Sequence, residues 1–395
     1  MFYYISFLRP PPVQAAPYGT ISIKPQISND LRTEPFDGEQ ELFYSWTQEG
    51  TRQPRTTKPI KLTTWRLSSA YKDIPLPVPA GVREGDRWRL TLTGQPQAHG
   101  HLTPECIDLS SSQVGRVPFP VMSMPVIFHG RGHKGSPKQE MVERTYLVPY
   151  VYRDLSSVTE DDPIPAGEKQ MAALHIRENT SFDLDKKIWD SGLGLCSWLI
   201  ELKENPALRA DNVELQRLRD SLFSDEPRKI LELGAGVGIL LAVIATLRSD
   251  LTNVKTGTDN LFATDVESAM PLLEENISIN DIYYKSNPPK ALVLDWDDEE
   301  LPEAVKTLQN LDAIVMADVT YNTASFPSLC RTLSTLVRMG PKAPTVILSY
   351  KVRDDAERDF WKMAVDVGID FVKIGQRVGA GGAPIEIWSG HVRQV

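Results

Sequence analysis

The sequence predicts an α/β fold with a mainly parallel sheet, preceded by a β-rich extension. From about residue 172 to the end, segments with strand-like and helix-like patterns alternate, which is typical of βαβ units. Residues 1–150 differ, because they carry 18 of the 30 prolines and show short β-rich runs without helical periodicity. We therefore expect a β-rich N-terminal module of unknown role in residues 1–150, a linker in 151–171 and an α/β domain in 172–395.

Proline and glycine divide the N-terminal module into short runs that are rich in β-branched and aromatic residues. Such runs predict strands joined by long loops, and the module carries no motif that indicates chemistry. The strands are expected at residues 2–8, 20–24, 41–46, 60–67, 88–93 and 145–151.

The cysteines and paired histidines do not have the spacing of a metal site. The cysteines are far apart, which argues against a disulfide framework or a zinc site and favours a reducing compartment, the cytoplasm or also the nucleus. The histidine pairs lie in glycine-containing loops, and no cysteine or clustered carboxylate completes a ligand set. We expect no bound metal. These residues are Cys106, Cys196 and Cys330, and the pairs His99 with His101 and His129 with His133.

Charge is unevenly distributed along the chain. Residues 1–150 hold 17 Lys+Arg and 13 Asp+Glu, a net charge of +4, whereas residues 151–395 hold 26 and 39, a net charge of −13. An acidic field suits a basic protein substrate better than nucleic acid. No apolar run approaches the ~18 residues that span a bilayer. We expect a monomer that acts on a protein and binds neither nucleic acid nor membrane.

Residues 228–247 carry the strongest local signal in the chain. They predict a buried strand, Lys229–Leu233, then a turn with glycines at 234, 236 and 238, then an apolar helix. Glycine allows a sharp turn at positive φ and lets a ligand approach the backbone closely. The start of a helix also offers unpaired N–H groups. This arrangement predicts a nucleotide-type ligand site at the carboxyl end of a parallel strand.

The spacing of the glycines argues against a dinucleotide as the ligand. A dinucleotide fingerprint, G-x-G-x-x-G, would place its third glycine at Ile239, but here that glycine comes one residue earlier. Glu232 stands just before the loop, and the segment Glu232-Leu-Gly-Ala-Gly-Val-Gly238 resembles the first motif of the seven-strand, S-adenosylmethionine-dependent methyltransferases. The resemblance implies a loop around a cationic sulfonium amino acid rather than a pyrophosphate, with which a nearby acid is compatible. On these residues alone, a glycine turn that serves only packing remains an alternative. The candidate ligand-binding residues of the loop are Gly234, Ala235, Gly236 and Gly238.

The other elements of the α/β domain surround this turn. Residues 172–177 predict a first strand, and apolar spacing after Asp190 predicts a helix that Asp190 or Ser191 would cap. After the turn we expect alternating strands and helices that close with a pair of strands. The expected strands are 260–265, 291–296, 311–317, 345–351, 370–374 and 385–392, and the expected helices are 267–280, 299–308, 324–339 and 354–367.

Acids stand at the ends of the next two strands. Asp265 ends the strand after the glycine loop, where a carboxylate can accept hydrogen bonds from two ribose hydroxyls. The alternative role for Asp265 is to cap the following helix. Asp295 and Trp296 end the next strand, and they are candidates for the edge and the face of an adenine ring. The alternative for Trp296 is a buried core position.

Ala317-Asp-Val-Thr-Tyr321 is the deciding motif, because it ends the strand at the switch point of the sheet. Together with the glycine loop, Asp265 and the Leu-Asp-Trp296 segment, it resembles the seven-strand, S-adenosylmethionine-dependent protein-lysine methyltransferases that carry a D-x-x-Y motif (methyltransferase family 16). The resemblance covers about the last 225 residues. It implies a class I, Rossmann-like methyltransferase domain, and it says nothing about residues 1–150.

The resemblance also implies roles for individual residues. Trp189, in Ile-Trp-Asp-Ser-Gly, would lie against the cofactor, and Trp296 and Ala317 would line its adenine and methionine sides. Asp318 and Tyr321 would lie near the methyl donor and orient a lysine amine of a chaperone, translation factor or ribosomal protein. Three alternatives stay open: a small-molecule methyltransferase, an inactive cofactor-binding scaffold that acts through the N-terminal module, and an NAD-dependent oxidoreductase.

Overall fold

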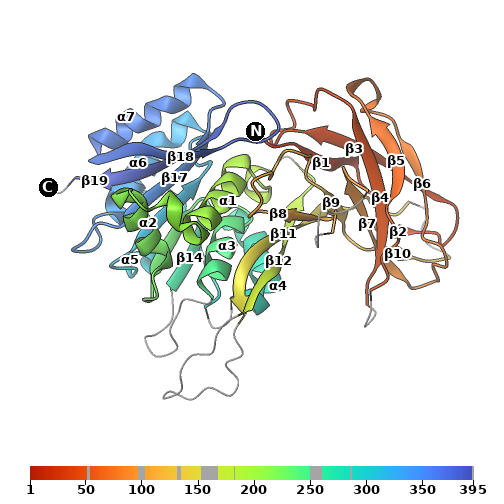
Figure 1. The fold of residues 1–395 in the computed structure, drawn as a ribbon, viewed down its shortest axis with the longest axis horizontal. Helices are drawn as coiled ribbons and strands as arrows, with labels where there is room; N and C mark the ends of the chain where they lie inside the picture. Colours follow the sequence, from red (N-terminus) through yellow and green to blue (C-terminus); the bar gives the residue numbers. More distant parts are fainter. Residues whose placement is uncertain are drawn as a thin grey trace, which may run out of the picture.

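The computed structural model describes residues 1–50, 54–96, 103–130, 135–152, 168–181, 183–249, 260–284 and 287–393. His99, His101, His133 and most of the expected linker lie outside these residues. Figure 1 shows two parts side by side: a β-rich part from the first half of the chain and an α/β part from the second. Within the described residues, no helix is long and apolar enough to cross a membrane, and no group of three or more His, Cys, Asp or Glu is placed to hold a metal ion.

The α/β part is built on a seven-stranded sheet in the order β15-β14-β13-β16-β17-β19-β18. All neighbours are parallel except β19, which runs antiparallel to both β17 and β18. The mainly parallel sheet and its closing pair of strands were predicted, and the predicted fold class is confirmed. The strands are β13 (Lys229–Leu233), β14 (Asn260–Asp265), β15 (Lys290–Val293), β16 (Ala313–Ala317), β17 (Thr345–Lys351), β18 (Ile369–Arg377) and β19 (Ile385–Val392).

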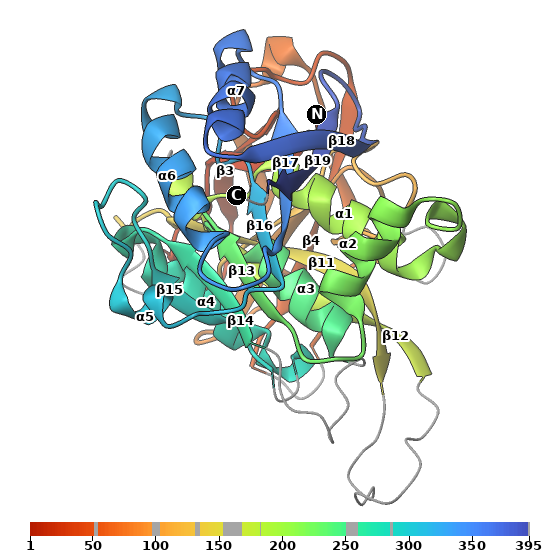
Figure 2. The same cartoon turned by 90° about the vertical axis from the view of Figure 1, so that its left-hand side faces the viewer.

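Helices cover both faces of this sheet, and each face has its own apolar core. Alternate residues of a strand point to opposite faces: Ile230 joins one core, and Leu231 and Leu233 join the other. Figure 2 shows α1 and α3 on one side and α6 and α7 on the other. The helices are α1 (Asp190–Glu204), α2 (Val213–Phe223), α3 (Ile239–Arg248), α4 (Met270–Ile279), α5 (Glu303–Lys306), α6 (Phe326–Leu336) and α7 (Asp359–Asp366).

The β-rich part contains a three-stranded sheet, β1-β3-β6, and a nine-stranded sheet. Each of the six runs predicted in this part overlaps a strand, although several boundaries differ. Buried tryptophans 46, 65 and 88 lie in the core of this part. Its strands are β1 (Tyr4–Arg9), β2 (Gln14–Ala15), β3 (Thr20–Ser28), β4 (Gln40–Gln48), β5 (Ile60–Trp65), β6 (Ile74–Pro77), β7 (Arg87–Thr93), β8 (Cys106–Asp108), β9 (Val121–Ser123), β10 (Val126–Phe128), β11 (Met141–Tyr152) and β12 (Glu168–Asn179).

The strand predicted to open the α/β domain belongs to the nine-stranded sheet instead. It is β12, which pairs with β11 along its whole length. β12 also contacts the α/β part, because two amides of α4 and the residue after it imitate a neighbouring strand. Asn276 bonds the backbone N–H and carbonyl of Arg177, and Asn280 does the same for His175. The β11–β12 hairpin therefore joins the two parts.

Two local predictions are corrected. Asp190 is not a helix cap: Trp189 occupies the N-cap position, and the fully buried Asp190 side chain binds Lys351 instead. The third strand and the helix after it are shorter than predicted, because β15 ends at Val293 and the following residues turn. The Asp295 side chain accepts the Asp297 N–H, and α5 begins only after Pro302. Asp295 and Trp296 therefore follow the strand rather than end it.

The ionisation of Glu143 on β11 determines how the stability of the junction changes with pH. The buried carboxylate of Glu143 lies 2.9 Å from Arg89 Nη1 and 3.1 Å from both Arg177 Nε and His175 Nδ1. Burial raises its pKa, but the hydrogen bond from His175 and the charge of Arg89 outweigh burial and lower the pKa to about 2. Because the folded-state pKa lies below the unfolded value, this stabilisation is complete above about pH 4.5 and is lost as the pH falls toward 2.

We expect the wild type to lose about 2 kcal/mol more unfolding free energy than Glu143→Gln between pH 6 and pH 3, because only the wild type titrates this group. Urea unfolding at a series of pH values measures the difference. Parallel stability curves for the two proteins would contradict the assignment.

Candidate functional site

The candidate site lies where the carboxyl ends of β13, β14 and β16 meet. The sheet order reverses here, since β14 lies on one side of β13 and β16 on the other, which is the usual ligand position in open α/β sheets. A cavity of about 350 Å³ opens at this edge. Of the predicted site residues, all but Gly238 line it. The lining set is Trp189, Glu232, Gly234, Ala235, Gly236, Asp265, Asp295, Trp296, Ala317, Asp318 and Tyr321.

The glycines of the loop serve two different purposes. Gly234 has a φ of 69°, and a Cβ there would lie 2.8 Å from Val319 Cγ1 and 3.3 Å from the Trp296 ring. A side chain at 234 would thus displace cavity walls. Gly238 has a φ of 81° and caps α3, and a Cβ there would lie 2.5 Å from Leu273 of α4. Gly238 therefore permits the turn and the packing of α4, and it does not line the cavity.

Asp265 fixes the glycine loop to the neighbouring strand. Its Oδ2 accepts the Gly236 N–H at 2.7 Å, and its Oδ1 accepts the Val266 N–H at 2.8 Å. Burial raises its pKa despite these two bonds. The side chain does not cap the following 3₁₀ turn, whose N-cap is Val266. Each oxygen keeps a further lone pair, so the carboxylate can still accept hydrogen bonds from a ligand in the cavity.

Glu232 is the most deeply buried acid of the cavity wall. It is 2% exposed, and its Oε2 accepts the Leu241 N–H at 3.2 Å. Burial raises the pKa of Glu232 well above its ordinary value, and the charge of Asp265 adds to the effect. A cationic ligand beside Glu232 would favour the ionised carboxylate.

Two indole rings line the cavity: that of Trp296, which follows β15, and that of Trp189, which precedes α1. Trp296 is half-buried, packs on the core under α6 and lies beside Gly234, so it serves both the core and the cavity. Trp189 donates its Nε1–H to the Leu184 carbonyl at 2.9 Å. Its ring lies 5.5 Å from the guanidinium of Arg353, within the range of a cation–π contact.

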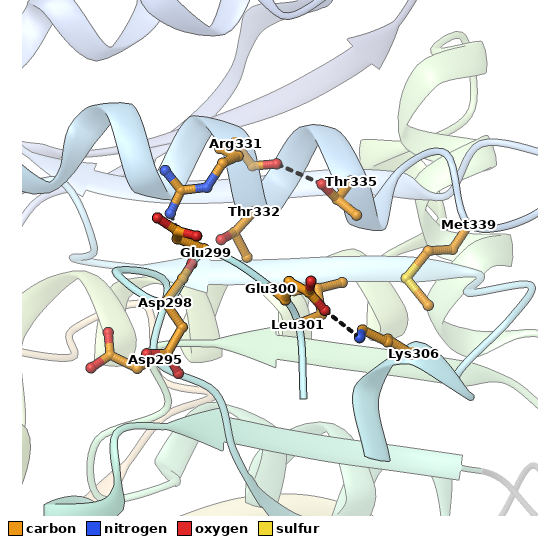
Figure 3. A pocket seen from close by; sticks show the side chains of 10 residues that line it. All are labelled: Asp295, Asp298, Glu299, Glu300, Leu301, Lys306, Arg331, Thr332, Thr335 and Met339. Carbon is orange, nitrogen blue, oxygen red and sulfur yellow. Dashed lines mark hydrogen bonds and ion pairs between the residues drawn. The ribbon is translucent and has the colours of Figure 1, made fainter. Parts of the chain in front are cut away.

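Asp295 also lines a second pocket of about 360 Å³ outside the first (Figure 3). Several charged side chains of this pocket have partners of their own: Lys306 lies 2.9 Å from Glu300, and Arg331 donates to the carbonyls of Trp296 and Asp298. This acidic pocket adjoins the adenine side of the predicted cofactor site and contains none of the other predicted site residues.

Asp318 has an unusual backbone, and its side chain accepts hydrogen bonds from Arg353 and Ser191. Its φ of 58° is uncommon for a residue other than glycine. Arg353 Nη1 donates to Asp318 Oδ1 at 2.6 Å, and Arg353 Nη2 and the Ser191 N–H donate to Oδ2 at 2.9 and 3.2 Å. A lysine amine near Asp318 would therefore meet a carboxylate that is already paired with Arg353.

Tyr321 lies three residues further on at the mouth of the cavity, and it is 50% exposed. Burial of part of the ring raises the pKa of its phenol, and the charges of Asp265, Asp185 and Asp297 raise it further. The phenol therefore stays protonated at neutral pH, and its oxygen can both donate and accept hydrogen bonds.

Several residues that shape the site were not found from the sequence. Arg353 follows β17, the strand next to Asp318, and its place at the carboxyl end of a parallel strand was an available signal. Lys351 ends the same strand. Asp30, which binds both cations, lies in the β-rich part, and no local pattern in the sequence connects it with this site.

The protein-family comparison agrees with this geometry. A family model described as lysine methyltransferase matches residues 168–366, about half of the chain, from the first residue of β12 to the last residue of α7. The chain belongs to this family. Its cofactor is therefore S-adenosylmethionine, and the enzyme is a methyltransferase. The glycine loop, the acceptor oxygens of Asp265 and the indole of Trp296 suit the amino-acid, ribose and adenine portions of that cofactor.

Characterised relatives are similar over part of their lengths. Protein-lysine N-methyltransferase EFM6 of Saccharomyces cerevisiae is 27% identical over 202 residues, which are 49% of this chain and 75% of that protein. EEF1A lysine methyltransferase 3 of Xenopus tropicalis is 28% identical, over 42% of this chain and 58% of that protein. Calmodulin-lysine N-methyltransferase of Arabidopsis thaliana is 26% identical, over 37% and 44%. The chain thus spans less than two thirds of the second and third relatives.

Substitution of Asp265 tests the cofactor site. Asparagine has one acceptor oxygen, so Asp265→Asn cannot hold the N–H groups of both Gly236 and Val266 as the carboxylate does, and it offers fewer acceptors to ribose hydroxyls. We expect affinity for S-adenosylhomocysteine to fall about tenfold or more, measured by calorimetry.

Asp312→Asn is the matched control. Asp312 also accepts a backbone N–H, that of Lys229 at 2.8 Å, but it does so at the far end of β13 and does not line the cavity. Equal losses of affinity in the two variants would show that Asp265 acts only through stability.

Proposed function

We propose that this enzyme transfers a methyl group from S-adenosylmethionine to the ε-amino group of a lysine in a protein substrate. The observation that supports it is that the Asp318–Tyr321 turn and the glycine loop line one cavity, with Tyr321 at its mouth. We propose that Trp189, Glu232, Asp265, Asp295, Trp296 and Ala317 hold the cofactor together with loop residues 234–236. A translation factor is the first substrate to test, because one relative is named for EEF1A.

The mouth of the cavity would favour the neutral form of the lysine amine and orient it. The cofactor, when bound, supplies an electrophilic methyl group. A free lysine has a pKa of about 10.4 and carries no lone pair while protonated. A partly desolvated channel lowers that pKa. We propose that the phenol oxygen of Tyr321 accepts a hydrogen bond from the amine, and that orienting the amine in this way supplies much of the rate.

The ion pair between Arg353 and Asp318 also favours transfer. An isolated carboxylate beside the amine would stabilise the ammonium form and hold its proton. Here the guanidinium offsets that charge at 2.6 Å. Asp318 thus shapes the turn that carries Tyr321 without opposing deprotonation of the lysine.

We also propose a monomeric protein of the cytoplasm or the nucleus that acts on protein rather than nucleic acid. Three free cysteines support the compartment, and the acidic balance of residues 151–395 supports a protein substrate. The β-rich part, together with β12, is proposed to be integral to the enzyme, since β12 pairs with β11 and contacts α4.

Tyr321→Phe tests the function. It removes one hydroxyl from a half-exposed ring, so the fold should be unchanged. With radiolabelled S-adenosylmethionine and a cell lysate, we expect the variant to transfer label to the substrate protein at least about tenfold more slowly, because the amine loses its orienting hydrogen bond. Its affinity for S-adenosylhomocysteine should stay near that of the wild type.

Tyr71→Phe is the control, because Tyr71 is 71% exposed and lies in the β-rich part. Label found on a small molecule rather than on lysine would contradict the proposal. A wild type that labels no protein would favour the inactive scaffold.

A further inference from the structure

We propose that Asp30, supplied by the β-rich part, is a positioning residue for methyl transfer: through Arg353 it holds the Asp318–Tyr321 turn in its working conformation. The inference rests on the proposed function of that turn. Asp30 lies outside residues 168–366, which match the family model, whereas Arg353 and Asp318 lie within them. The two parts of the chain would thus build one transfer site together.

Asp30 follows β3 and projects into the junction of the two parts. It is 3% exposed as a residue, and its side chain is fully buried. The turn that carries it is held by the side chain of Asn29, which accepts the N–H groups of Thr33 and Glu34 at 3.0 and 3.2 Å. Lys187 also donates to the Asp30 carbonyl at 2.6 Å. The carboxylate therefore reaches the α/β part from a fixed backbone.

Each oxygen of Asp30 binds one cation: Lys351, the last residue of β17, or Arg353, two residues later. Oδ1 accepts from Lys351 Nζ at 2.8 Å, and Oδ2 accepts from Arg353 Nη2 at 2.8 Å. Burial raises the pKa of Asp30, but the nearby Arg353 and Lys351 outweigh it, and the pKa ends below its ordinary value. Asp30 is accordingly a carboxylate at neutral pH.

Arg353 connects Asp30 to the motif. Along one edge of its planar guanidinium, Nη1 and Nη2 donate to the two oxygens of Asp318, and Nη2 also donates to Asp30. A guanidinium held at two points has little freedom to rotate, so the position of Asp318 depends on the position of Asp30. The same guanidinium lies over Trp189, which lines the cofactor cavity.

Lys351 carries a second branch of the network to the first turn of α1. Its Nζ lies 2.8 Å from both Asp30 and Asp190. Asp190 in turn accepts the Phe2 N–H at 3.0 Å and the Tyr4 hydroxyl at 2.8 Å. In Figure 1 the N-terminal end and β1 lie at the junction of the two parts. The residue after Asp190 donates its N–H to Asp318, so both branches end at the motif.

The charges indicate that Asp30→Asn will fold. The network holds three carboxylates, of Asp30, Asp190 and Asp318, and two cations. Asparagine at 30 leaves Lys351 paired with Asp190 and Arg353 paired with Asp318, and its amide keeps the shape of the carboxylate. The substitution therefore removes the charged second hold on Arg353 and leaves each buried ion with a partner.

If the network served only stability, Asp30→Asn would lower the melting temperature without lowering the rate of methyl transfer. The rate therefore distinguishes a positioning role from a purely structural one. With lysate substrate and varied S-adenosylmethionine, we expect Asp30→Asn to lower kcat at least about tenfold while KM for the cofactor changes less than about twofold. The control is Glu275→Gln, which breaks the ion pair of Glu275 with Arg177 between α4 and β12, away from the cavity. The kcat of Glu275→Gln should remain near the wild-type value, even if its melting temperature falls as much as that of Asp30→Asn.

The outcomes are distinct. A wild-type rate in Asp30→Asn, or an equal loss of kcat in Glu275→Gln, would overturn the inference, whereas a wild type without activity would overturn the proposed function instead. A crystal structure of Asp30→Asn gives a readout that does not depend on activity. We expect the Arg353 guanidinium to turn and its two bonds to Asp318 to lengthen, and an unmoved ion pair would overturn the inference.

Discussion

The arrangement of this enzyme depends on one guanidinium that is mostly covered by its neighbours. Arg353 lies between Asp318 of the α/β part and Asp30 of the β-rich part, and it is bonded to both. A buried charge costs several kcal/mol unless it is paired, and loss of one partner typically costs about 3–5 kcal/mol. The position of Arg353 is therefore strongly specified, and so are the turn that carries Tyr321 and the contact between the two parts of the chain.

The β11–β12 hairpin supports that contact by a different interaction. β12 completes the nine-stranded sheet, while Asn276 and Asn280 bond its backbone as a neighbouring strand would. Unpaired backbone groups at a sheet edge are a liability, and these two amides satisfy part of the edge. The hairpin thus belongs to both parts, and a boundary between residues 150 and 172 would separate two strands that pair over their full lengths.

Similarity to the lysine methyltransferases explains the cofactor site but not the whole molecule. The matched residues contain the glycine loop, Asp265, Trp296, Asp318 and Tyr321. The β-rich part lies before them, yet it supplies Asp30, and the N–H of Phe2 and the hydroxyl of Tyr4, to the network around Asp318. Residues outside the matched segment therefore contact the network around Asp318.

The sequence by itself determined the parts of the site that depend on local order along the chain. A glycine turn after an apolar strand, and acids near the ends of later strands, become neighbours because parallel strands end at one edge of the sheet. The D-x-x-Y motif was likewise recognised from its position at the end of a strand. The sequence did not show that Asp318 forms an ion pair with Arg353. Only the tertiary structure decided that Asp190 is an ion-pair partner of Lys351 and that Asp30 is bonded to Arg353. Asp30 and Arg353 are separated by 323 residues, and an ion pair between such distant residues leaves no periodicity that a single sequence can show.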